Sequence, residues 1–401
     1  MLRSAADVHA HVGAVCFKTG PPGTVGAELE WLVADRSDPS LPVPPERSRR
    51  ALEAAGDLPG GSTFTSEPGG QVELSSLPFT GIPAQPGLGD CLSALAADVD
   101  HLAGALAVEG LRLVPRAADA DRPPRRLLHA PRYDAMEAYF AARPGLGRHM
   151  MCSTAATQVC LDAGADADDV RRRWALLHAL GPVLAATFAN APRLHARPGA
   201  MRSWRQHVWS TVDRWQPCPT GGDPVSAWAA HAVAAPVMSV RRDDGPWTAD
   251  PGVTFTGWLG GGLAEPPTAA DLDHHLSTLF PPVRPRGYLE VRYLDAQAPR
   301  WWPVPVAVLV ALVEDAVASE RAWAAAAPVP AAHADPWGVA ARRATSDPVL
   351  GRAASACLAA ALDALPRLGA DPATSGLVAA FADRFTFRGR CPADDPGEDP
   401  C

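Results

Sequence analysis

Three short stretches of the chain place acidic, amide or arginine side chains two residues apart within strand-like sequence. They carry the pairs Glu28 and Glu30, Gln71 and Glu73, and Glu290 and Arg292. Residues i and i+2 of a β-strand point to the same face of a sheet, so the two members of each pair would share a face. Three such strands side by side would form a face lined with carboxylates and one arginine.

A face of this kind needs counter-charge, because carboxylates a few ångströms apart repel one another strongly. Hard divalent cations with oxygen ligands are the usual solution in proteins. A cluster of Mg²⁺ on a sheet points to nucleotide phosphates as the remaining ligands. The alternative for each stretch taken alone is an ordinary strand with a solvated polar face.

The composition narrows the classes of function. The chain has 401 residues, of which 47% are hydrophobic and 20% charged, as in a globular protein. The net charge of −8 argues against a nucleic-acid partner. Lys18 is the sole lysine and lies in Cys16-Phe17-Lys18-Thr19, so a Gly-x-x-x-x-Gly-Lys-Ser/Thr phosphate loop is excluded. Any bound ATP must therefore be held by metal and arginine.

The cysteines and the apolar runs indicate the compartment. None of the eight cysteines forms a Cys-x-x-Cys pair, so zinc ribbons and thioredoxin motifs are not supported. The first 20 residues lack the apolar core of a signal peptide, and the longest apolar run, 304–313, is about half a membrane span. We expect a reduced cytoplasmic protein without a membrane partner. Residues 391–401 are expected to be a disordered tail with free thiols rather than a Cys391–Cys401 disulfide.

Strands and helices are expected to alternate without a regular βαβ rhythm. Strands are expected at 25–33, 71–75, 154–162 and 287–294. Helices are expected at 46–55, 90–108, from 168, at 272–280, at 304–327 and through the Ala-rich C-terminal third. Asp90 is expected to be the N-cap of the second helix, and Gly181-Pro182 to interrupt the third. Residues 214–252 are expected to be loop-rich. This order favours an α+β fold with an antiparallel sheet in one domain, residues 1–390.

Several segments, in order from Gly26 to about Asp315, resemble the glutamate–cysteine ligases of the plant and proteobacterial type. The segments are Ser66–Ser75 (similar to EPGGQxELSG), Arg132-Tyr133 with Met136 (GRYxxM), Met150-Met151 with Thr157-Gln158-Val159 and Leu161-Asp162 (MM…T…QVNLD), Ser203–Trp209 (S-x-R-x-H-x-W), and Leu279-Phe280-Pro281 with Tyr288–Arg292 (FPxVR…YLExR). Two departures are Cys160 in place of the family's Asn and Ser76 in place of its Gly. The N-terminal segment and the Trp-rich, lysine-poor character are most similar to the actinobacterial branch dedicated to ergothioneine synthesis.

The resemblance implies a fold and a reaction. The fold would be a glutamine-synthetase-like core, in which a curved antiparallel sheet carries the active site on its concave face and helices pack on the other side. The reaction would join the γ-carboxyl of L-glutamate to the amine of L-cysteine through γ-glutamyl phosphate, giving γ-glutamylcysteine, ADP and phosphate. Mg²⁺, with Mn²⁺ as the alternative, would be the cofactor and ATP the co-substrate.

The resemblance also implies roles for individual residues. The metal ligands would be Glu28, Glu30, Glu67, Glu73 and Glu290. The residues at the reacting groups would be Glu290, Arg292, which would contact a phosphate together with Gln71, and Arg205, which would bind the α-carboxylate of glutamate with its planar fork. The other substrate contacts would come from Gln158, Trp209, Arg132, Tyr133 and Met151.

Simpler interpretations stay open beside these roles. Glu290 and Arg292 could be a plain ion pair on a strand, Trp209 a core indole and Met151 a core side chain. For the whole chain the alternatives are another ATP-dependent carboxylate–amine ligase, a guanidino kinase of the same scaffold, or a non-catalytic metabolite-binding relative.

Overall fold

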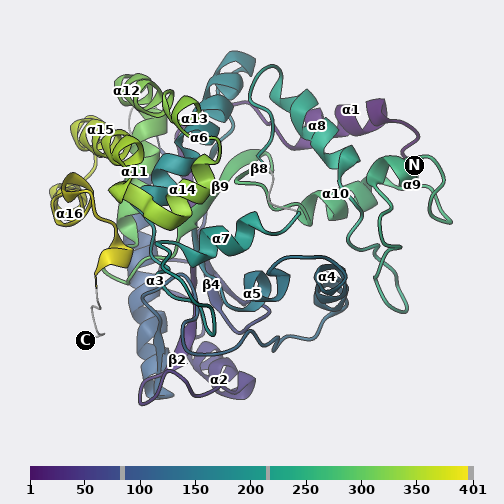
Figure 1. Ribbon diagram of the computed structural model, residues 1–401, viewed down its shortest axis with the longest axis horizontal. Helices are drawn as coiled ribbons and strands as arrows, with labels where there is room; N and C mark the ends of the chain where they lie inside the picture. The colour runs from purple at the N-terminus through teal and green to yellow at the C-terminus, as the bar shows by residue number, and fades with distance from the viewer. Residues whose placement is uncertain (82–85, 214–216, 396–401) are drawn as a thin grey trace.

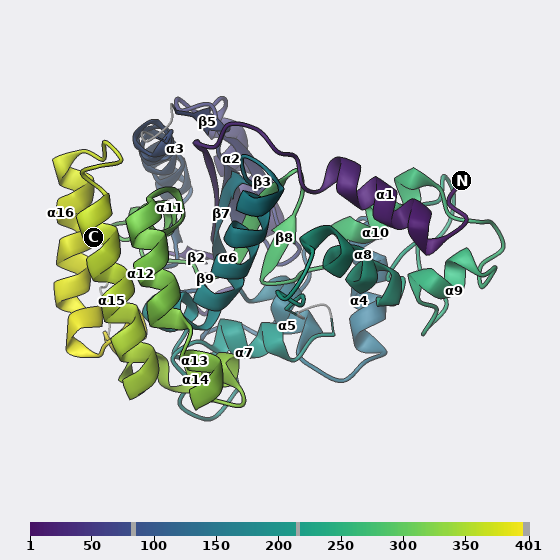
Figure 2. The same ribbon diagram turned by 90° about the horizontal axis from the view of Figure 1, so that it is seen from above.

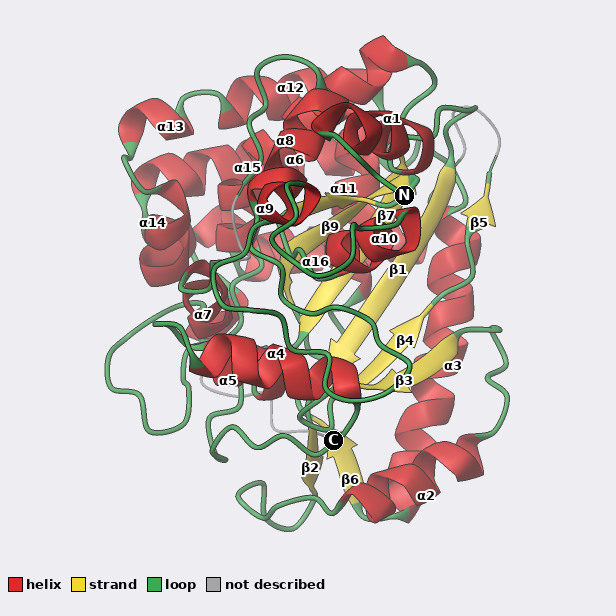
Figure 3. Ribbon diagram, turned by 90° about the vertical axis from the view of Figure 1, so that its right-hand side faces the viewer, coloured by secondary structure: helices red, strands yellow, loops and turns green. Residues whose placement is uncertain are grey.

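The computed structural model (Figure 1) describes residues 1–81, 86–213 and 217–395. Its centre is a seven-stranded sheet with the order β3-β4-β1-β7-β9-β8, and β5 also pairs with β1. Every pairing in the sheet is antiparallel, which confirms the α+β expectation (Figure 3). The strands are β1 (Thr24–Trp31), β3 (Thr63–Ser66), β4 (Val72–Ser75), β5 (Phe79–Thr80), β7 (Ala156–Asp162), β8 (Val283–Pro285) and β9 (Tyr288–Asp295). A separate two-stranded sheet pairs β2 (Val33–Asp35) with β6 (Leu111–Leu113).

One face of the main sheet packs against long helices. Its direct neighbours are α3 (Leu88–Val108), α6 (Ala167–Thr187) and α11 (Pro303–Glu314), which contact β1, β9 and β7 respectively. Behind them lie α12 (Ala316–Ala326), α15 (Pro348–Ala364) and α16 (Pro372–Arg384), which form the helical side of the molecule in Figure 2. The apolar side chains that alternate along β1, among them Val25, Leu29 and Trp31, are buried on this side.

The other face is covered by shorter helices and loops, seen in front of the strands in Figure 3. They are α1 (Ala5–Val15), α4 (Pro131–Ala141), α5 (Gly147–Cys152), α7 (Trp204–Ser210), α8 (Pro224–Ala234), α9 (Phe255–Leu259) and α10 (Ala269–Ser277). Three further helices, α2 (Pro45–Ala55), α13 (Val329–Ala332) and α14 (Pro336–Arg343), complete the periphery. The polar positions of β1 point toward this covered face, so the covering elements decide what those positions meet.

Several element boundaries differ from the expected ones. The helix expected at 304–327 is two helices, because Asp315 adopts an extended conformation and caps α12 by accepting from the Ala318 N–H. Conversely, α6 continues through Pro182, and Gly181 leaves room there for the Trp337 ring. Helix α3 begins earlier than expected, after Gly87 rather than at an Asp90 cap. The region expected to be loop-rich contains α8, and residues 214–216 of that region lie outside the described part.

The expected disordered tail is wrong for its first five residues. Cys391 is fully buried, and Pro392–Asp394 form a 3₁₀ turn that packs against the chain after α6 through the Ala393 N–H and Ala189 carbonyl. The thiol of Cys391 is free but lies in the core rather than on a mobile tail. The rest of that expectation, residues 396–401, lies outside the described residues.

Helix α3 is the one helix of the described ranges that is long and apolar enough to cross a membrane by length and composition. Core helices pass the same test, so it is weak evidence for a span. Here α3 packs against α2, β1 and β6 and buries Cys91, Leu95, Leu102 and Leu106.

Candidate active site

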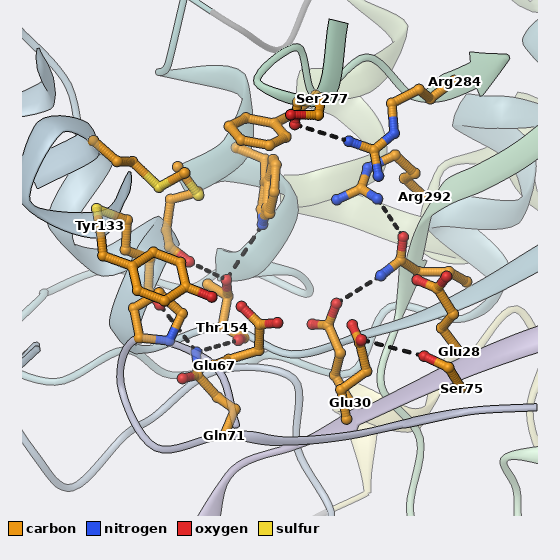
Figure 4. Close-up of a pocket in the computed structure, with 18 of the residues that line it drawn as sticks. Glu28, Glu30, Glu67, Gln71, Ser75, Tyr133, Thr154, Ser277, Arg284 and Arg292 are labelled. Atoms are coloured by element: carbon orange, nitrogen blue, oxygen red, sulfur yellow. Dashed lines mark hydrogen bonds between the residues drawn. The ribbon is translucent and has the colours of Figure 1, made fainter. Parts of the chain in front are cut away.

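A cavity of about 460 Å³ lies on the covered face of the sheet. Four glutamates line it, and the sheet register places three of them together: Glu30 lies opposite Glu73 across the β1–β4 pair, and Glu28 lies one pleat away, opposite Ser75 and Gln158. The fourth, Glu67, comes from the turn between β3 and β4 (Figure 4). The predicted carboxylate-lined face therefore exists, and the strand pairs Glu28/Glu30 and Gln71/Glu73 both contribute to it.

The turn that carries Glu67 depends on two glycines. Glu67 and Gln71 close it through a Glu67 N–H to Gln71 carbonyl bond of 2.8 Å. Gly70 has a φ of +85°, a region that residues other than glycine rarely adopt. A side chain on Gly69 would place its Cβ 2.3 Å from the Cys152 carbonyl oxygen. These glycines let the turn lie directly on the end of α5, which aims Glu67 into the cavity.

The four glutamates share an electrostatic problem. Burial, followed by the charges of neighbouring glutamates, raises the pKa of each of Glu28, Glu30, Glu67 and Glu73 to about 7. Gln158 donates to Glu30 Oε1 at 2.7 Å, and the Ala156 N–H donates to Oε2 at 2.8 Å, which fixes this carboxylate. Repulsion among buried carboxylates is the condition under which a bound cation lowers the energy most.

Arginines line the other part of the cavity. They are Arg132, Arg284, Arg286 and Arg292, of which Arg284 and Arg292 lie near Glu28 in Figure 4. Arg132 donates to the Ser277 hydroxyl and carbonyl at 2.9 and 3.0 Å, which holds it at the end of α10. Arg292 donates to Gln158, so a chain of hydrogen bonds runs from this arginine to Glu30. The cavity thus brings unpaired negative charge and clustered positive charge to two sides of one space.

Glu290, expected as a metal ligand, lies behind the arginines of the cavity wall, close enough that its charge adds to burial in raising the pKa of Glu28. It is fully buried and does not line the cavity. Its carboxylate accepts from Arg284 at 2.7 and 3.1 Å, from Arg286 at 3.1 Å and from Arg292 at 2.8 Å. Burial alone would raise the pKa of Glu290, but Arg284, Arg292 and Arg286 hold it well below its usual range. In this arrangement the carboxylate of Glu290 anchors three arginines, and its role as a metal ligand stays a prediction.

Arg205 and Gln71 also differ from their expected placement. Arg205 is 1% exposed and does not line the cavity; it lies behind Trp209 and donates from Nη2 to the Arg292 carbonyl at 2.7 Å. Its Nε and Nη1 have no hydrogen-bond partner among the described residues. Gln71 lines the cavity, yet its amide bonds the Gly69 N–H and the carbonyls of Met151 and Thr154. Gln71 therefore ties the Glu67 turn to α5 rather than presenting its amide to a phosphate.

The remaining predicted substrate residues all line the cavity. Trp209 forms a wall, with its indole N–H donating to Thr154 at 3.3 Å, and Gln158, Arg132, Tyr133 and Met151 reach the same space. Tyr133 lies on the side opposite Arg284 in Figure 4, and burial, followed by the charge of Glu67, raises its pKa to about 12.

Sequence reasoning missed several lining residues. They are Arg284, Arg286, Met136, Met150, Phe280, Ser277, Thr154, Pro68 and Ser75. Arg284 and Arg286 had a readable signal, because they stand two residues apart just before the predicted strand at 287–294 and Arg284 ends the FPxVR-like segment. Met136 and Met150 add to the apolar lining of the cavity with Met151, while Phe280 lies against Trp209 and Arg292.

The acidic side of the cavity fits a hard divalent cation by the chemistry of its donors. Glu28, Glu30, Glu67 and Glu73 supply only oxygen atoms, as Mg²⁺ and Mn²⁺ prefer, and a cation there would offset their repulsion. Within residues 1–81, 86–213 and 217–395, no three His, Cys, Asp or Glu side chains lie close enough together to hold a metal ion. The carboxylates of the four glutamates would have to rotate toward one another to bind one ion.

Comparisons with known proteins agree with this geometry. Residues 24–396 match the model of glutamate–cysteine ligase family 2. The chain is 42% identical over 391 residues to the glutamate–cysteine ligase EgtA of Mycobacterium tuberculosis, covering 95% of this chain and 87% of that protein. It is 40% identical over 403 residues to EgtA of Mycolicibacterium smegmatis, covering 98% and 90%. The chloroplastic glutamate–cysteine ligase of Arabidopsis thaliana is 32% identical over 257 residues, or 59% of this chain and 46% of that one.

Among solved structures, the glutamate–cysteine ligase of Francisella tularensis in complex with AMP superimposes with a TM-score of 0.50 at 11% identity. The superposition covers 94% of this chain and 84% of that one. A likeness at this identity speaks for a shared fold. Because the family model matches nearly the whole chain and two relatives exceed 39% identity over most of it, the chain belongs to glutamate–cysteine ligase family 2.

Proposed function

We propose that this enzyme joins the γ-carboxyl of L-glutamate to the amine of L-cysteine at the expense of ATP. The observation that carries the proposal is one cavity in which four carboxylates meet four arginines, within a chain of the glutamate–cysteine ligase family. The sheet face that bears the cavity would be the concave face of a glutamine-synthetase-like core. The catalytic domain would span residues 1–390, extended by the packed segment up to Asp395.

The reaction brings two anions together, the glutamate carboxylate and the phosphates of ATP, and the arginines would offset their repulsion. A γ-carboxylate oxygen attacks the γ-phosphorus of ATP, the bond to the β,γ-bridging oxygen breaks, and ADP leaves. Arg284, Arg286 and Arg292 would bind phosphoryl oxygens and stabilise the charge that spreads over them during transfer. Glu290 keeps these guanidiniums fixed, so little reorganisation is needed when the phosphate arrives.

The acidic side would hold Mg²⁺, or Mn²⁺, on Glu28, Glu30, Glu67 and Glu73. When bound, the ion would neutralise phosphate charge and orient the phosphate chain. Gln158 contributes by linking the two sides, because it donates to Glu30 and accepts from Arg292. This link fixes the distance between the carboxylates and the arginines.

Glutamate would be held by Arg205. The Nε and Nη1 groups of this buried guanidinium lack hydrogen-bond partners within the described chain, and buried donors of this kind normally have a partner. An α-carboxylate reaching the floor of the cavity beside Trp209 would accept from Nε and from Nη2, which share one edge of the guanidinium, whereas Nη1 lies on the other edge and faces Asp295. Arg205 does not line the cavity, so Trp209 or Arg292 must shift when glutamate binds.

In the second half of the reaction the amine nitrogen of cysteine attacks the acyl carbon of γ-glutamyl phosphate. The carbon–oxygen bond to phosphate breaks and the amine loses a proton. The lining methionines Met136, Met150 and Met151 would receive the cysteine side chain, since polarizable thioethers suit a thiol. Arg132 of α4, which donates to Ser277 at the end of α10, would complete this boundary.

We further propose that the product serves ergothioneine synthesis in the cytoplasm. The support is the identity of 40–42% to EgtA proteins over nearly the whole chain, against 32% over 59% of it for a plant chloroplast enzyme. Seven cysteines in the described ranges carry free thiols, which is typical of a reducing compartment.

The test is ADP release from the purified protein with MgATP and L-glutamate, with and without L-cysteine, together with mass spectrometry of the product. Cysteine-dependent ADP release with γ-glutamylcysteine is the expected result. Turnover with a different amine would keep the acyl phosphate chemistry and overturn the cysteine assignment. Folded protein that binds MgATP but turns over no amine would instead support a non-catalytic metabolite-binding protein.

A further inference from the structure

A buried polar network lies directly beneath Arg205. Its centre is Asp295, the last residue of β9, which is 2% exposed and does not line the cavity. Its Oδ1 accepts from the Ser203 hydroxyl at 3.0 Å and forms an ion pair with Arg205 Nη1 at 3.6 Å. Its Oδ2 accepts from the Asn190 N–H at 2.8 Å. Both oxygens are thus used within the protein, so Asp295 is not available to a substrate.

This network fixes the guanidinium of Arg205 from several directions. Ser203 is the N-cap of α7, accepting from the Gln206 N–H at 2.9 Å, so the helix that carries Arg205 starts on the same hydroxyl that binds Asp295. Arg205 Nη2 donates to the Arg292 carbonyl at 2.7 Å. Nη1 therefore faces Asp295 and Nη2 is bound to β9, while Nε stays without a hydrogen-bond acceptor among the described residues.

The same network continues to the C-terminal segment. Arg116 donates from Nη1 to Asn190 Oδ1 at 2.8 Å and to the Pro392 carbonyl at 2.9 Å, and from Nη2 to the Asp395 carbonyl at 2.7 Å. The segment is also held by an ion pair between Arg202 and Asp394 at 2.8 Å. Residues 391–395 thus brace the loop that leads from Asn190 to Ser203.

We propose that Asp295 is the positioning residue of Arg205 and that the C-terminal segment, residues 391–395, braces this pair through Arg116 and Asn190. The inference rests on the proposed function, because it takes Arg205 as the residue that binds the α-carboxylate of glutamate. A guanidinium held by a buried carboxylate keeps its charge and its orientation, and both are needed for bidentate binding of a carboxylate.

The test compares Asp295→Asn with Asp98→Asn as a matched control. Asp98 is also fully buried and accepts from two backbone N–H groups, those of Gly60 and Ser62, but it contacts no arginine there. We expect Asp295→Asn to raise the KM for L-glutamate about 10-fold or more while the KM for ATP stays within about 2-fold. Asp98→Asn should lower the thermal midpoint without changing either KM.

Two further measurements keep the test decisive. The glutamate-induced rise in thermal midpoint, measured without ATP, should shrink in Asp295→Asn and stay unchanged in Asp98→Asn, and it does not depend on turnover. Arg116→Gln, which leaves Asp295 and Arg205 in place, should raise the KM for L-glutamate by a smaller factor, and it replaces Asp295→Asn if that variant does not fold.

A wild-type KM for L-glutamate in folded Asp295→Asn, or equal rises in both KM values, would overturn the inference. A wild-type protein that neither binds nor ligates glutamate would instead overturn the proposed function, and this result is visible before any variant is made.

Discussion

The site has two halves, an acidic half (Glu28, Glu30, Glu67 and Glu73) and an arginine half around Glu290, and they shift the pKa values of their glutamates in opposite directions. On β1 and β4, Glu28, Glu30 and Glu73 face one another, and burial together with their mutual charge raises each pKa to about 7. On β9, Glu290 faces Arg284 across the β8–β9 pair and is contacted by Arg286 and Arg292, so its pKa is lowered. The residue type and the strand spacing are the same, and the neighbours differ: Glu290 has Arg284 across the strand pair and Arg292 two residues along its own strand.

The difference teaches that an acid pair on a strand does not reveal its role until the neighbouring strand is known. Carboxylates that repel one another favour the binding of a cation. A carboxylate that accepts hydrogen bonds from several guanidiniums instead holds these groups in place for an anion. Under the proposed function the two halves would be complementary, because a metal–nucleotide complex would present positive charge to the first and phosphate oxygens to the second.

The largest expected effect comes from breaking the acidic half. Glu30→Gln removes a charge from the carboxylate that Gln158 and the Ala156 N–H hold in place. Loss of a group that only hydrogen-bonds to a metal ligand costs about 10- to 100-fold in metal affinity or activity. Loss of a ligand itself should therefore lower kcat/KM by about 100-fold or more. The half-saturating Mg²⁺ concentration should rise as well. Full activity at ordinary Mg²⁺ in folded Glu30→Gln would remove the acidic half from the reaction.

A smaller effect on activity is expected from Glu290→Gln. This change leaves three buried or half-buried arginines without their shared carboxylate, and breaking a buried ion pair typically costs about 3–5 kcal/mol of stability. Displaced arginines should lower kcat by about 10-fold, since small misplacements of binding groups are costly. The half-saturating Mg²⁺ concentration should stay near the wild-type value.

Titration with Mg²⁺ decides between the two interpretations of Glu290. A marked rise in the half-saturating Mg²⁺ concentration would restore Glu290 as a metal ligand. Arg286→Gln is the matched control, because the Arg286 side chain is 49% exposed and supplies only one of the contacts to Glu290. It should change kcat in the same direction by less.

Many of the strands and helices could be predicted from the sequence, because they depend on the local spacing of apolar and polar residues. Alternation along residues 24–31 predicts one polar and one apolar face, and β1 has them. The apolar repeat of 90–108 predicts a helix that packs on the sheet, which α3 does. The break at Asp315 was missed because the apolar pattern continues across it, and the cap that ends the helix is set by backbone geometry.

The sequence predicted many of the residues that line the cavity, but only some of the contacts that they make. Glu28, Glu30, Glu67 and Glu73 reach one cavity as expected. The role of Glu290 was not readable, since it depends on the register that places Arg284 opposite it. Likewise, Arg205 was expected in the cavity, but Asp295, 90 positions away in the chain, holds it behind Trp209.

The smallest effect is expected in the stability of the metal-free protein, and its sign follows from the acidic half. The pKa values of Glu28, Glu30, Glu67 and Glu73 are about 7 in the folded state, against 4.5 for an unperturbed glutamate. Between these values the folded protein binds more protons than the unfolded chain, so the free energy of unfolding falls as pH rises.

In EDTA the thermal midpoint should therefore fall from pH 5 to pH 7.5, by about 1 °C for each kcal/mol lost in a chain of 401 residues. Added Mg²⁺ should remove most of this decline, because a bound cation stabilises the ionised carboxylates. In the metal-free protein, Glu30→Gln should reduce the fall of the thermal midpoint with pH. Arg286→Gln, in the arginine half, should leave this fall unchanged. A midpoint that rises with pH over this range would mean that the carboxylates of the acidic half already have counter-charge in the protein itself, and the contrast between the two halves would fail.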